Sequence, residues 1–347
     1  MTIITLSEDR LQTNSWQWQL QNAIRSVDKL SAALEIELPE VPVSFPLLVP
    51  LPFVDRMAKR DPLDPLLLQV LPRDEENHDV SGYRTDPLDE MDLDSGTKGL
   101  IQKYHGRVLI ITTGACGVNC RYCFRRHFPY ADYQPNQDDW ISLVDHIRDD
   151  RSLNEVILSG GDPLAMKDSY LASLISSIEQ IKHIDTIRLH TRMPVVIPQR
   201  ICDELLDWVT ASNKKLVFVL HVNHPNEIDD QVANSISRLR DANVTLLNQS
   251  VLLKNINDTA QTLTELSRRL FSIGVLPYYL HLFDPVSGAQ HFDVAEETGL
   301  RLIKEITGKL PGYLVPRLAR EVPGSDAKLT LRTNRLKLIR KEAIRAL

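Results

Sequence analysis

The chain has few cysteines, no long apolar segment and no excess of basic residues. Only four of its 347 residues are cysteine, and no stretch approaches the ~20 apolar residues of a membrane-spanning helix. The N-terminus lacks a basic segment followed by an apolar core, so we expect no secretory signal. The net charge of −6 argues against a general nucleic-acid binder. We therefore expect a globular protein whose partners include neither a membrane nor a nucleic acid.

Three of the four cysteines form a C-x3-C-x2-C triplet, Cys116, Cys120 and Cys123. Such clustering without even pairing fits a reducing cytoplasm better than a disulfide framework. Three thiolates can hold an iron–sulfur cube and leave one iron free to bind a reactant. A zinc site is the alternative, but tetrahedral zinc needs a fourth ligand, for which Cys202 and His127 are candidates. Cys202 lies in a helical pattern, and we expect it to be a small buried hydrophobe.

The first hundred residues differ in composition from the rest of the chain. Residues 14–37 have a helical pattern, and residues 39–73 are rich in proline. Proline fixes φ and removes a backbone donor, so short helices and extended connectors are expected there. Residues 74–98 are polar and acidic, which predicts a solvated connection. We therefore expect an N-terminal helical region over 1–98 that packs against the main domain.

From residue 106 onward, short β-branched runs alternate with longer helical patterns. Continuous apolar strands separated by helices predict a parallel sheet with crossover helices. A full TIM barrel needs eight such units and ~250 residues, so six units predict an α/β fold with a partial (β/α)6 barrel over 99–315. Its active site is expected at the carboxyl ends of the strands, and residues 316–347 follow as a loop and a helix. The predicted strands are 107–113, 155–160, 186–191, 216–222, 244–250 and 276–283, and the helices lie near 138–149, 168–182, 199–212, 227–241, 258–273 and 293–307.

A second motif, Ser159-Gly160-Gly161-Asp162, stands at the end of the second predicted strand. Adjacent glycines let the backbone approach a ligand closely, and exposed N–H groups before a helix attract a carboxylate. Taken alone, the motif favours an ordinary turn between a strand and a helix.

The cysteine triplet, with its aromatic neighbours Tyr122 and Phe124, resembles the cluster loop of radical S-adenosylmethionine (SAM) enzymes. Further blocks resemble the pyridoxal phosphate-dependent lysine 2,3-aminomutase family, and the resemblance covers residues from about 100 to 330. Members of that family are isomerases that move an α-amino group to the β-carbon. The resemblance implies three cofactors, namely a [4Fe–4S] cluster, SAM and pyridoxal phosphate. The blocks are RLHTRMPVVIPQR (188–200), HVNHPNEI (221–228), LNQSVLLKNIND (247–258) and PYYLHLFDPVSGAQHF (277–292).

The resemblance also implies where the first two cofactors bind. The three cysteines would hold the cluster, and the SGGD motif would hold the SAM amino group. Asp162 stands where the GGE-type motif of radical SAM enzymes has glutamate, which is the form seen in the lysine 2,3-aminomutase family. Polar side chains at later strand ends are implied as further contacts to SAM, although buried histidines at such places are as often structural. These side chains are His190, His221, Asn248 and Gln249.

Lys328 is implied as the lysine that binds pyridoxal phosphate. It ends REVPGSDAK (320–328), where family members have a glycine-rich loop; here Ser325, Asp326 and Ala327 stand instead of glycines. The loop is therefore expected to be stiffer. A lysine that attacks an aldehyde must be neutral, so its pKa should be lowered by burial or by a nearby cation. The alternative is a solvated surface lysine.

The remaining implied contacts are charged or aromatic. Arg107 would bind the cofactor phosphate and Tyr104 would help to position the cofactor. Arg125 would clamp the substrate α-carboxylate with both arms of its guanidinium, although a surface ion pair is the alternative for either arginine. Asp284 and Glu321 would hold the substrate ε-ammonium, which implies L-lysine as substrate. Glu321 is one methylene longer than the aspartate usual in the family.

Within the family, the proline-rich N-terminal region and REVPGSDAK resemble the branch that makes (R)-β-lysine for translation elongation factor P. A separate ligase then attaches β-lysine to that factor. No cysteine follows Cys202, so we expect no C-terminal zinc site of the catabolic kind. An electron donor and a possible homo-oligomer complete the expected partners. Alternatives are an aminomutase that serves other metabolism, and a non-catalytic iron–sulfur or zinc regulator, which would not need Arg125, Asp284 and Lys328 together.

The last segment, residues 329–347, is basic and has helical spacing. Such a helix would cover the barrel or dock a partner, or would simply be an amphipathic surface helix.

Overall fold

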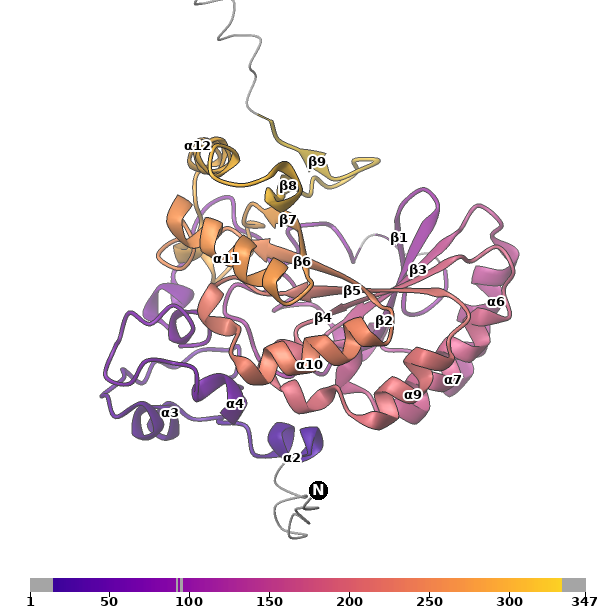
Figure 1. Cartoon of the computed structure of the whole chain (residues 1–347), viewed down its shortest axis with the longest axis horizontal. Helices are drawn as coiled ribbons and strands as arrows, with labels where there is room; N and C mark the ends of the chain where they lie inside the picture. Colours follow the sequence, from indigo (N-terminus) through magenta and orange to yellow (C-terminus); the bar gives the residue numbers. More distant parts are fainter. Residues whose placement is uncertain (1–14, 92, 94–95, 333–347) are drawn as a thin grey trace, which may run out of the picture.

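A computed structural model of the chain describes residues 15–91, 93 and 96–332. Its centre is one nine-stranded sheet in which the strands follow one another in chain order (Figure 1). Strands β2 to β8 are parallel neighbours. The two edge strands β1 and β9 pair antiparallel and not with each other in the described part of the chain, so the barrel stays open. The strands are β1 (Leu100–Tyr104), β2 (Arg107–Thr113), β3 (Glu155–Gly160), β4 (Thr186–Thr191), β5 (Lys215–His221), β6 (Thr245–Val251), β7 (Leu276–His281), β8 (Arg317–Arg320) and β9 (Leu329–Thr330).

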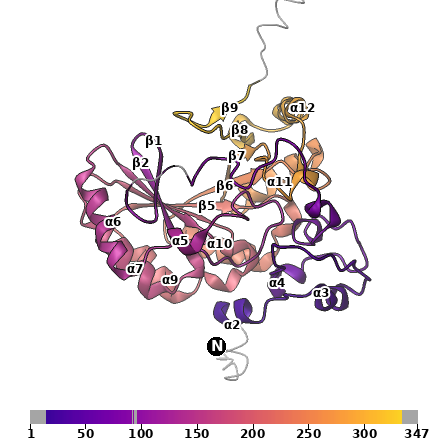
Figure 2. The same ribbon diagram turned by 180° about the vertical axis from the view of Figure 1, so that it is seen from behind.

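A helix connects each parallel strand to the next one. Asn136, Asp229 and Thr259 each accept hydrogen bonds from the first turn of the helix they precede, so local sequence fixes where these helices begin. Figure 2 shows that α6, α7, α9 and α10 follow one face of the sheet. These helices do not cover the carboxyl ends of the strands, where a ligand-binding site can form. The connecting helices are α6 (Gln137–Asp149), α7 (Asp168–Glu179), α9 (Asp203–Ala211), α10 (Asp230–Asp241), α11 (Ala260–Ser272) and α12 (Glu296–Thr307).

The core of the domain lies between these helices and the sheet. Leu158, Ile187 and Phe218 on three neighbouring strands are fully buried, as are Ile236 and Leu239 on α10. The two α10 residues lie three positions apart, so they share the face of the helix that covers the sheet. The six predicted strands and six predicted helices are all present, and the prediction of a partial barrel is confirmed.

Three strands were missed, because none of them is a continuous apolar run. β1 is only half apolar, β8 has the sequence RLAR, and β9 has two residues. β8 and β9 extend the sheet beyond residue 315, whereas the division of the chain at residues 98 and 315 stays a prediction. The helix predicted for 329–347 is wrong at its start, which forms β9, and residues 333–347 lie outside the described residues.

The helix predicted for residues 14–37 is broken into α2 (Trp16–Gln21) and α3 (Val27–Leu34). Asn22 ends α2 by bonding back to the Trp18 carbonyl, and Ile24 exchanges two backbone hydrogen bonds with Val49. A helix cannot continue through a residue that pairs as a strand. The proline-rich segment does contain short helices and connectors, such as α4 (Leu51–Val54), which begins after Pro50.

The N-terminal region packs against the turn that follows β4. α4 contacts the short helix α8 (Met193–Val196), and α2 contacts the 3-10 turn η4 (Pro198–Arg200). This packing brings residues from the first quarter of the chain to the mouth of the sheet.

The prediction that residues 74–98 are a solvated connection is wrong at two acidic positions. Glu76 is 9% exposed and is hydrogen-bonded to Arg121 and Arg126. Glu90 is 3% exposed and forms ion pairs with Arg125 and Lys103. The acidic composition of this segment predicted exposure to solvent. The arginines that pair with Glu76 and Glu90 are distant in sequence, so composition could not reveal them.

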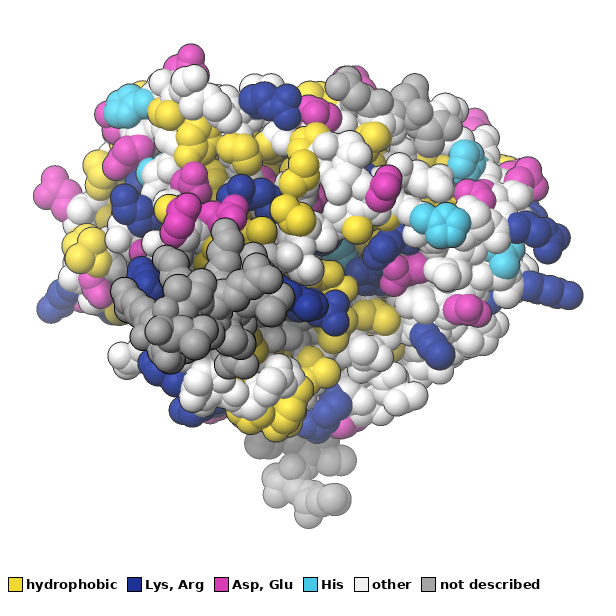
Figure 3. Space-filling view, turned by 90° about the horizontal axis from the view of Figure 1, so that it is seen from above, with side chains coloured by type: hydrophobic (Ala, Val, Ile, Leu, Met, Phe, Trp, Pro, Cys, Tyr) yellow, Lys and Arg dark blue, Asp and Glu magenta, His cyan; other side chains and the backbone are white. Residues whose placement is uncertain are grey.

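None of the described helices combines the length and the apolar character that a membrane crossing requires. Figure 3, which looks onto the molecule from above, shows acidic and basic side chains interspersed on that face.

Candidate active site

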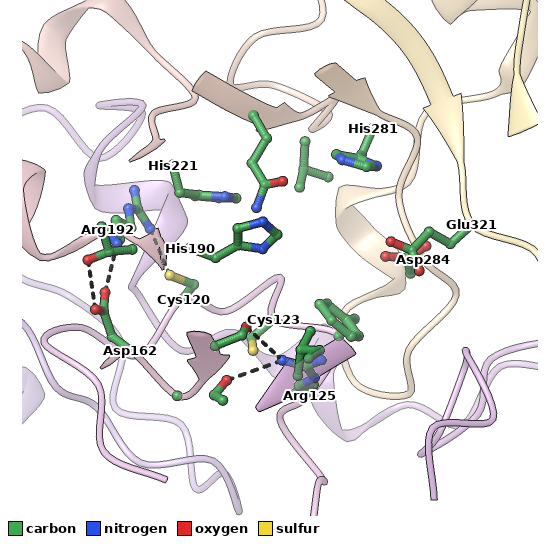
Figure 4. Close-up of a pocket in the computed structure, with 18 of the residues that line it drawn as sticks. Cys120, Cys123, Arg125, Asp162, His190, Arg192, His221, His281, Asp284 and Glu321 are labelled. Carbon is green, nitrogen blue, oxygen red and sulfur yellow. Dashed lines mark hydrogen bonds between the residues drawn. The ribbon is translucent and has the colours of Figure 1, made fainter. Parts of the chain in front are cut away.

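A cavity of about 360 Å³ opens at the carboxyl ends of the parallel strands. This size lies within the usual range for small-molecule sites. Figure 4 shows Cys120 towards one side of it, Asp284 and Glu321 together at the other, and His190 between them. All of the predicted site residues except Asn248 line this one cavity: Tyr104, Arg107, Cys116, Cys120, Cys123, Arg125, Ser159, Gly160, Gly161, Asp162, His190, His221, Gln249, Asp284, Glu321 and Lys328.

Asn248 was also considered as a contact to SAM, but it is used by the fold. Its amide accepts from the Val222 backbone N–H at 2.9 Å and donates to the Val222 carbonyl at 3.1 Å and to Ser250 at 3.0 Å. These bonds tie β6 to the end of β5. Asn248 therefore supports the wall of the cavity from behind.

The three cysteines lie on the loop after β2, and all three thiols are free. Arg121, which is fully buried, fixes this loop by bonding Glu76 and the Phe45 carbonyl. Burial and, after it, the charge of the neighbouring Cys120 raise the pKa of Cys123 to about 11. The protein alone does not favour a thiolate at Cys123, whereas a bound metal centre would deprotonate it.

The two glycines of the SGGD motif bring two turns together. The Gly161 N–H donates to the Thr113 carbonyl at 2.7 Å, and the Asp162 N–H donates to the Ala115 carbonyl at 2.8 Å. A Cβ on Gly161 would lie 2.3 Å from the Ala115 oxygen, so only glycine permits this contact. The glycines were predicted to let the backbone approach a ligand closely. In the structure they let it approach the backbone of the cysteine loop.

The Asp162 carboxylate accepts four hydrogen bonds from the protein. Its Oδ1 accepts from the Leu164 N–H at 3.0 Å and the Thr191 hydroxyl at 2.7 Å. Its Oδ2 accepts from the backbone N–H groups of Arg192 at 2.7 Å and Met193 at 3.0 Å. Both oxygens are occupied, so the side chain joins the end of β3 to the end of β4. Each carboxylate oxygen already accepts two hydrogen bonds from the protein, so neither is free to accept one from the SAM amino group.

Arg192 was missed by the sequence analysis, although it lies within the RLHTRMPVVIPQR block. Its Nη1 donates to the Cys120 Sγ at 2.7 Å and to the Tyr122 hydroxyl at 2.7 Å. Burial alone would lower the pKa of this guanidinium, but the charges of Cys120, Tyr122 and Glu227 raise it well above its ordinary value. Arg192 therefore remains a cation beside the three cysteines.

Charged side chains alternate in sign along the other wall of the cavity. Arg125 is bonded to Glu90 through Nε at 2.6 Å and Nη2 at 2.9 Å. Glu90 also meets the Lys103 ammonium at 2.8 Å, which in turn lies 3.3 Å from Glu321. The Glu321 carboxylate then pairs with the Lys328 Nζ at 2.6 Å. The chain of ion pairs therefore joins the predicted carboxylate clamp to the predicted cofactor lysine.

Asp284 lies beside this chain without a hydrogen bond or ion pair from its side chain to any other described residue (Figure 4). Burial and, after it, the charge of Glu321 raise its pKa to about 7. Burial would also raise the pKa of Glu321, but Lys328 and Lys103 hold that pKa well below its usual range. The pair thus contains one firmly ionised carboxylate and one that ionises readily when a further cation arrives.

The expectation for the protonation state of Lys328 stays a prediction. The Lys328 side chain is 22% exposed, and its Nζ pairs with Glu321 and lies 5.4 Å from the centre of the Tyr279 ring. Arg107 and Tyr104 lie against each other on the adjoining wall, with the guanidinium carbon 5.3 Å from the ring centre.

The histidines of the cavity are neutral. Burial lowers the pKa of His221 and of His281 to about 3 in each case, and it lowers the pKa of His190 well below its ordinary value. His221 bonds the Tyr122 hydroxyl at 2.9 Å. The buried Nε2 of His190 has no hydrogen-bond partner among the described residues. An orphaned nitrogen in the middle of a cavity is open to a polar ligand.

The zinc alternative fits the geometry poorly. No group of three or more His, Cys, Asp or Glu side chains in the described chain converges around a single ion. Cys202 is bonded to Asp168 at 3.7 Å and is contacted by Arg200 at 3.6 Å, and His127 bonds the Ser287 carbonyl at 3.0 Å. Neither joins the triplet. Neither candidate therefore supplies the fourth ligand that tetrahedral zinc needs.

The comparisons with known proteins agree with this arrangement. Residues 110–266 match the Radical SAM superfamily, so the open sheet and its cysteine loop define a protein of the radical SAM class. The chain is 44% identical to L-lysine 2,3-aminomutase of Escherichia coli (strain K12), over 95% of this chain and 97% of that one. It is 45% identical to the protein of the same name from Haemophilus influenzae, over 91% and 95%. The chain belongs to the lysine 2,3-aminomutase family.

More distant similarities exist as well. L-lysine 2,3-aminomutase of Clostridium subterminale is 33% identical over 92% of this chain and 78% of its own length. Among solved structures, Streptococcus suis SuiB bound to S-adenosylmethionine is similar with a TM-score of 0.47 and 15% identity, over 63% of this chain and 51% of that one.

Radical SAM proteins hold a [4Fe–4S] cluster and SAM, and lysine 2,3-aminomutases use pyridoxal phosphate as well. The residues present fit these groups. Three free thiols are available at one side of the cavity, and the orphaned His190 nitrogen lies in its middle. A primary amine, Lys328, and a guanidinium, Arg107, lie on the remaining wall. Aminomutases are isomerases, so the chain is a member of a family of enzymes.

Proposed function

We propose that this enzyme converts L-lysine to (R)-β-lysine, which is then used to modify translation elongation factor P. One observation carries the proposal: three free thiols and a lysine flanked by two carboxylates line the same cavity. A cluster site without a place for an amino acid would suit a regulator. A place for a dibasic amino acid beside the thiols suits an aminomutase.

When bound, the cluster and SAM supply the radical that removes a hydrogen atom, and pyridoxal phosphate supplies the aldehyde that carries the amino group. The protein has to hold these groups and the substrate in one orientation and to keep water away. Cys116, Cys120 and Cys123 would bind the cluster, and Lys328 would bind the aldehyde. Arg107 is placed to meet the phosphate, because a guanidinium suits that geometry.

Arg125 is proposed to bind the substrate α-carboxylate through the one arm that Glu90 does not occupy. The Nη1 of Arg125 lies 3.2 Å from the Ser159 hydroxyl and 3.4 Å from the Gly160 carbonyl. The other two donors are already held by Glu90. A clamp that uses both arms would require Glu90 to withdraw, so a contact through a single arm follows from this packing.

The charges around Asp284 favour a substrate with a cationic side chain. The Asp284 side chain has no hydrogen-bond or ion-pair partner among the described residues, whereas Glu321 pairs with Lys103 and Lys328. The ε-ammonium of free lysine would supply Asp284 with a partner, whereas a neutral or acidic side chain would not.

Apolar and aromatic side chains close the rest of the cavity. Leu109, Ile157, Val251 and Phe283 line it together with Tyr279. Such a lining excludes water and protects a reactive species from side reactions. Unpaired thiols and an oxygen-sensitive cluster also need reducing surroundings, so we place the reaction in the cytoplasm, with a cellular reductant as electron donor.

Chiral analysis of the product tests the proposal. Purified protein would be incubated without oxygen with L-lysine, SAM, pyridoxal phosphate and dithionite, and we expect (R)-β-lysine at the expense of lysine. Addition of elongation factor P and its ligase should transfer that product to the factor, as a mass increase. Absence of turnover by cluster-loaded protein would favour the regulator. Turnover to a β-lysine that the ligase does not accept would favour the aminomutase of other metabolism.

A further inference from the structure

Arg192 connects the cluster cysteines to the deepest part of the fold. It directly follows β4 and is only 6% exposed. One arm of its guanidinium reaches the Cys120 sulfur at 2.7 Å and the Tyr122 hydroxyl at 2.7 Å. Figure 4 shows this contact at the side of the cavity away from Asp284. A cationic donor therefore lies directly on one of the three thiols.

The other arm of the guanidinium is held from behind. Its Nη2 donates to the Gln69 Oε1 at 2.7 Å and to the Glu227 Oε2 at 2.9 Å. Glu227 is itself fully buried and accepts from the Asn223 N–H at 2.9 Å and the His224 N–H at 3.0 Å.

Two aromatic rings confine the plane of the guanidinium as well. Its carbon lies 5.2 Å from the centre of the Phe53 ring and 5.7 Å from that of Tyr122. Gln69 and Phe53 come from the N-terminal region, and Glu227 comes from the turn after β5. The orientation of Arg192 is thus fixed by three distant segments of the chain, with no freedom to turn away from Cys120.

A hydrogen bond from a cation to a thiolate withdraws negative charge from the sulfur. The effect is larger when the metal centre carries an additional electron, so such a bond stabilises the reduced cluster and raises its reduction potential. Cleavage of SAM requires that the cluster accept an electron and pass it on, so this potential sets both steps. The other two thiols have no comparable hydrogen-bond donor from a side chain among the described residues.

We propose that Arg192 is a positioning residue for the iron–sulfur cluster, which fixes the Cys120 thiolate and raises the reduction potential of the cluster. The inference rests on the proposed function, because it presupposes that the three thiols hold a [4Fe–4S] cluster. It adds a task for the N-terminal region, which supplies two of the residues that hold the guanidinium in place.

Arg200 provides a matched control on the same segment. It is also fully buried, pairs with one carboxylate, Asp168, at 2.8 Å, and lies 4.6 Å from the centre of an aromatic ring, that of Trp16. It even contacts a sulfur, that of Cys202, at 3.6 Å. That thiol does not line the cavity, so a change at Arg200 perturbs a similar ion pair without touching the cluster loop.

The experiment compares R192K and the double variant R192Q/E227Q with R200K and R200Q/D168N. The double variants remove both partners and so avoid an unpaired buried carboxylate. After reconstitution without oxygen, iron and sulfide per chain would be measured, and the midpoint potential of the cluster would be followed by its electron paramagnetic resonance signal. We expect a more negative midpoint potential in both Arg192 variants and the wild-type value in both Arg200 variants. A wild-type potential in R192Q/E227Q with a full complement of iron would overturn the proposal.

A measurement on otherwise unchanged protein covers the case in which the Arg192 variants fail to fold or to retain iron. Protein labelled with 15N only at the guanidinium nitrogens of arginine would be reduced, and pulsed resonance would detect coupling between the cluster and a guanidinium nitrogen. The coupling should persist in the separate variants R125K and R126K, which remove the two arginines beside Cys123. Its absence from the labelled wild-type protein would equally refute the role of Arg192. Failure of the proposed function would instead show as a missing cluster or missing β-lysine in the wild type.

Discussion

The two ends of the cavity are built in different ways. At the end with the thiols, Arg192, Glu227 and Gln69 are each less than 10% exposed and are hydrogen-bonded to one another. At the other end, the side chains of Lys103, Glu321 and Lys328 are about one-fifth exposed and alternate in charge, and Asp284 has no fixed partner in the described chain. A buried network suits a cofactor that stays, and a partly exposed one suits ligands that enter and leave.

The largest effect is expected from removing a cluster thiol. Cys120→Ala should lose the iron chromophore and all turnover, since Arg192 would then face a methyl group and the cluster would lack one of its three ligands. Cys202→Ala is the control, because this thiol bonds Asp168 outside the cavity. Iron per chain and the visible spectrum are the measurements. Retention of both iron and activity in Cys120→Ala would show that the thiols at this end of the cavity do not hold a cluster.

The next effect concerns the lysine at the charged end. Lys328→Ala should lose the visible absorption band of protein-bound pyridoxal phosphate and reduce turnover by about a thousandfold or more, because no other described lysine except Lys103 lines the cavity. The iron content should stay at the wild-type level. Lys304→Ala, on the exposed side of α12, serves as the control. An unchanged absorption band in Lys328→Ala would assign the cofactor to a different lysine.

How much of this site could be foreseen differs between the two ends. The thiols, the SGGD motif and the residues at strand ends were predicted because each motif follows a predicted strand, and parallel strands end at one edge of a sheet. The six apolar strands were found for the same reason. The order of the motifs along the chain was therefore enough to predict that they lie at one edge of the sheet, without any knowledge of side-chain contacts.

The residues that join these motifs could not be foreseen. Arg192 and Gln69 are 123 positions apart in the chain, and Arg125 and Glu90 are 35 apart. Glu90 lies in an acidic run whose composition predicts exposure, and Lys103 lies on a short edge strand. Pairs of this kind arise only once the chain has folded, and periodicity carries no signal for them.

A smaller effect is expected from Asp284→Asn. Neutralising a carboxylate that binds an ammonium removes roughly 1.5–3 kcal/mol, so kcat/KM for lysine should fall roughly ten- to a hundredfold. The wild-type profile should rise with pH through about 7, because the folded pKa of Asp284 is raised to about 7 and the ionised form binds the ε-ammonium. This limb should be absent from Asp284→Asn.

The same pKa has a consequence for stability. A carboxyl group whose pKa is raised on folding stabilises the protein fully below its unfolded value of about 3.9 and loses that contribution as the pH rises towards 7. The melting temperature without ligands should therefore fall between these values more steeply in the wild type than in Asp284→Asn. Equal slopes in the two proteins would contradict the assignment.

The smallest effect is expected from Lys103→Gln, which tests how independent the two ends are. Lys103 lowers the pKa of Asp284 from its place beside Glu321, so its loss should move the acidic limb of kcat/KM above 7. We expect a change of only a few-fold in the maximal rate, because an ion pair that is partly exposed contributes about 1 kcal/mol or less. The midpoint potential of the cluster should not move. A shifted potential would show that the two ends are coupled.

The most direct test is a crystal structure of the protein prepared without oxygen, with SAM, pyridoxal phosphate and lysine, and with iron located by anomalous scattering. The account predicts iron at Cys116, Cys120 and Cys123, and electron density continuous from the cofactor to Lys328 or to the substrate within the same cavity. Zinc alone at the thiols, or a cofactor bound elsewhere on the chain, would contradict it.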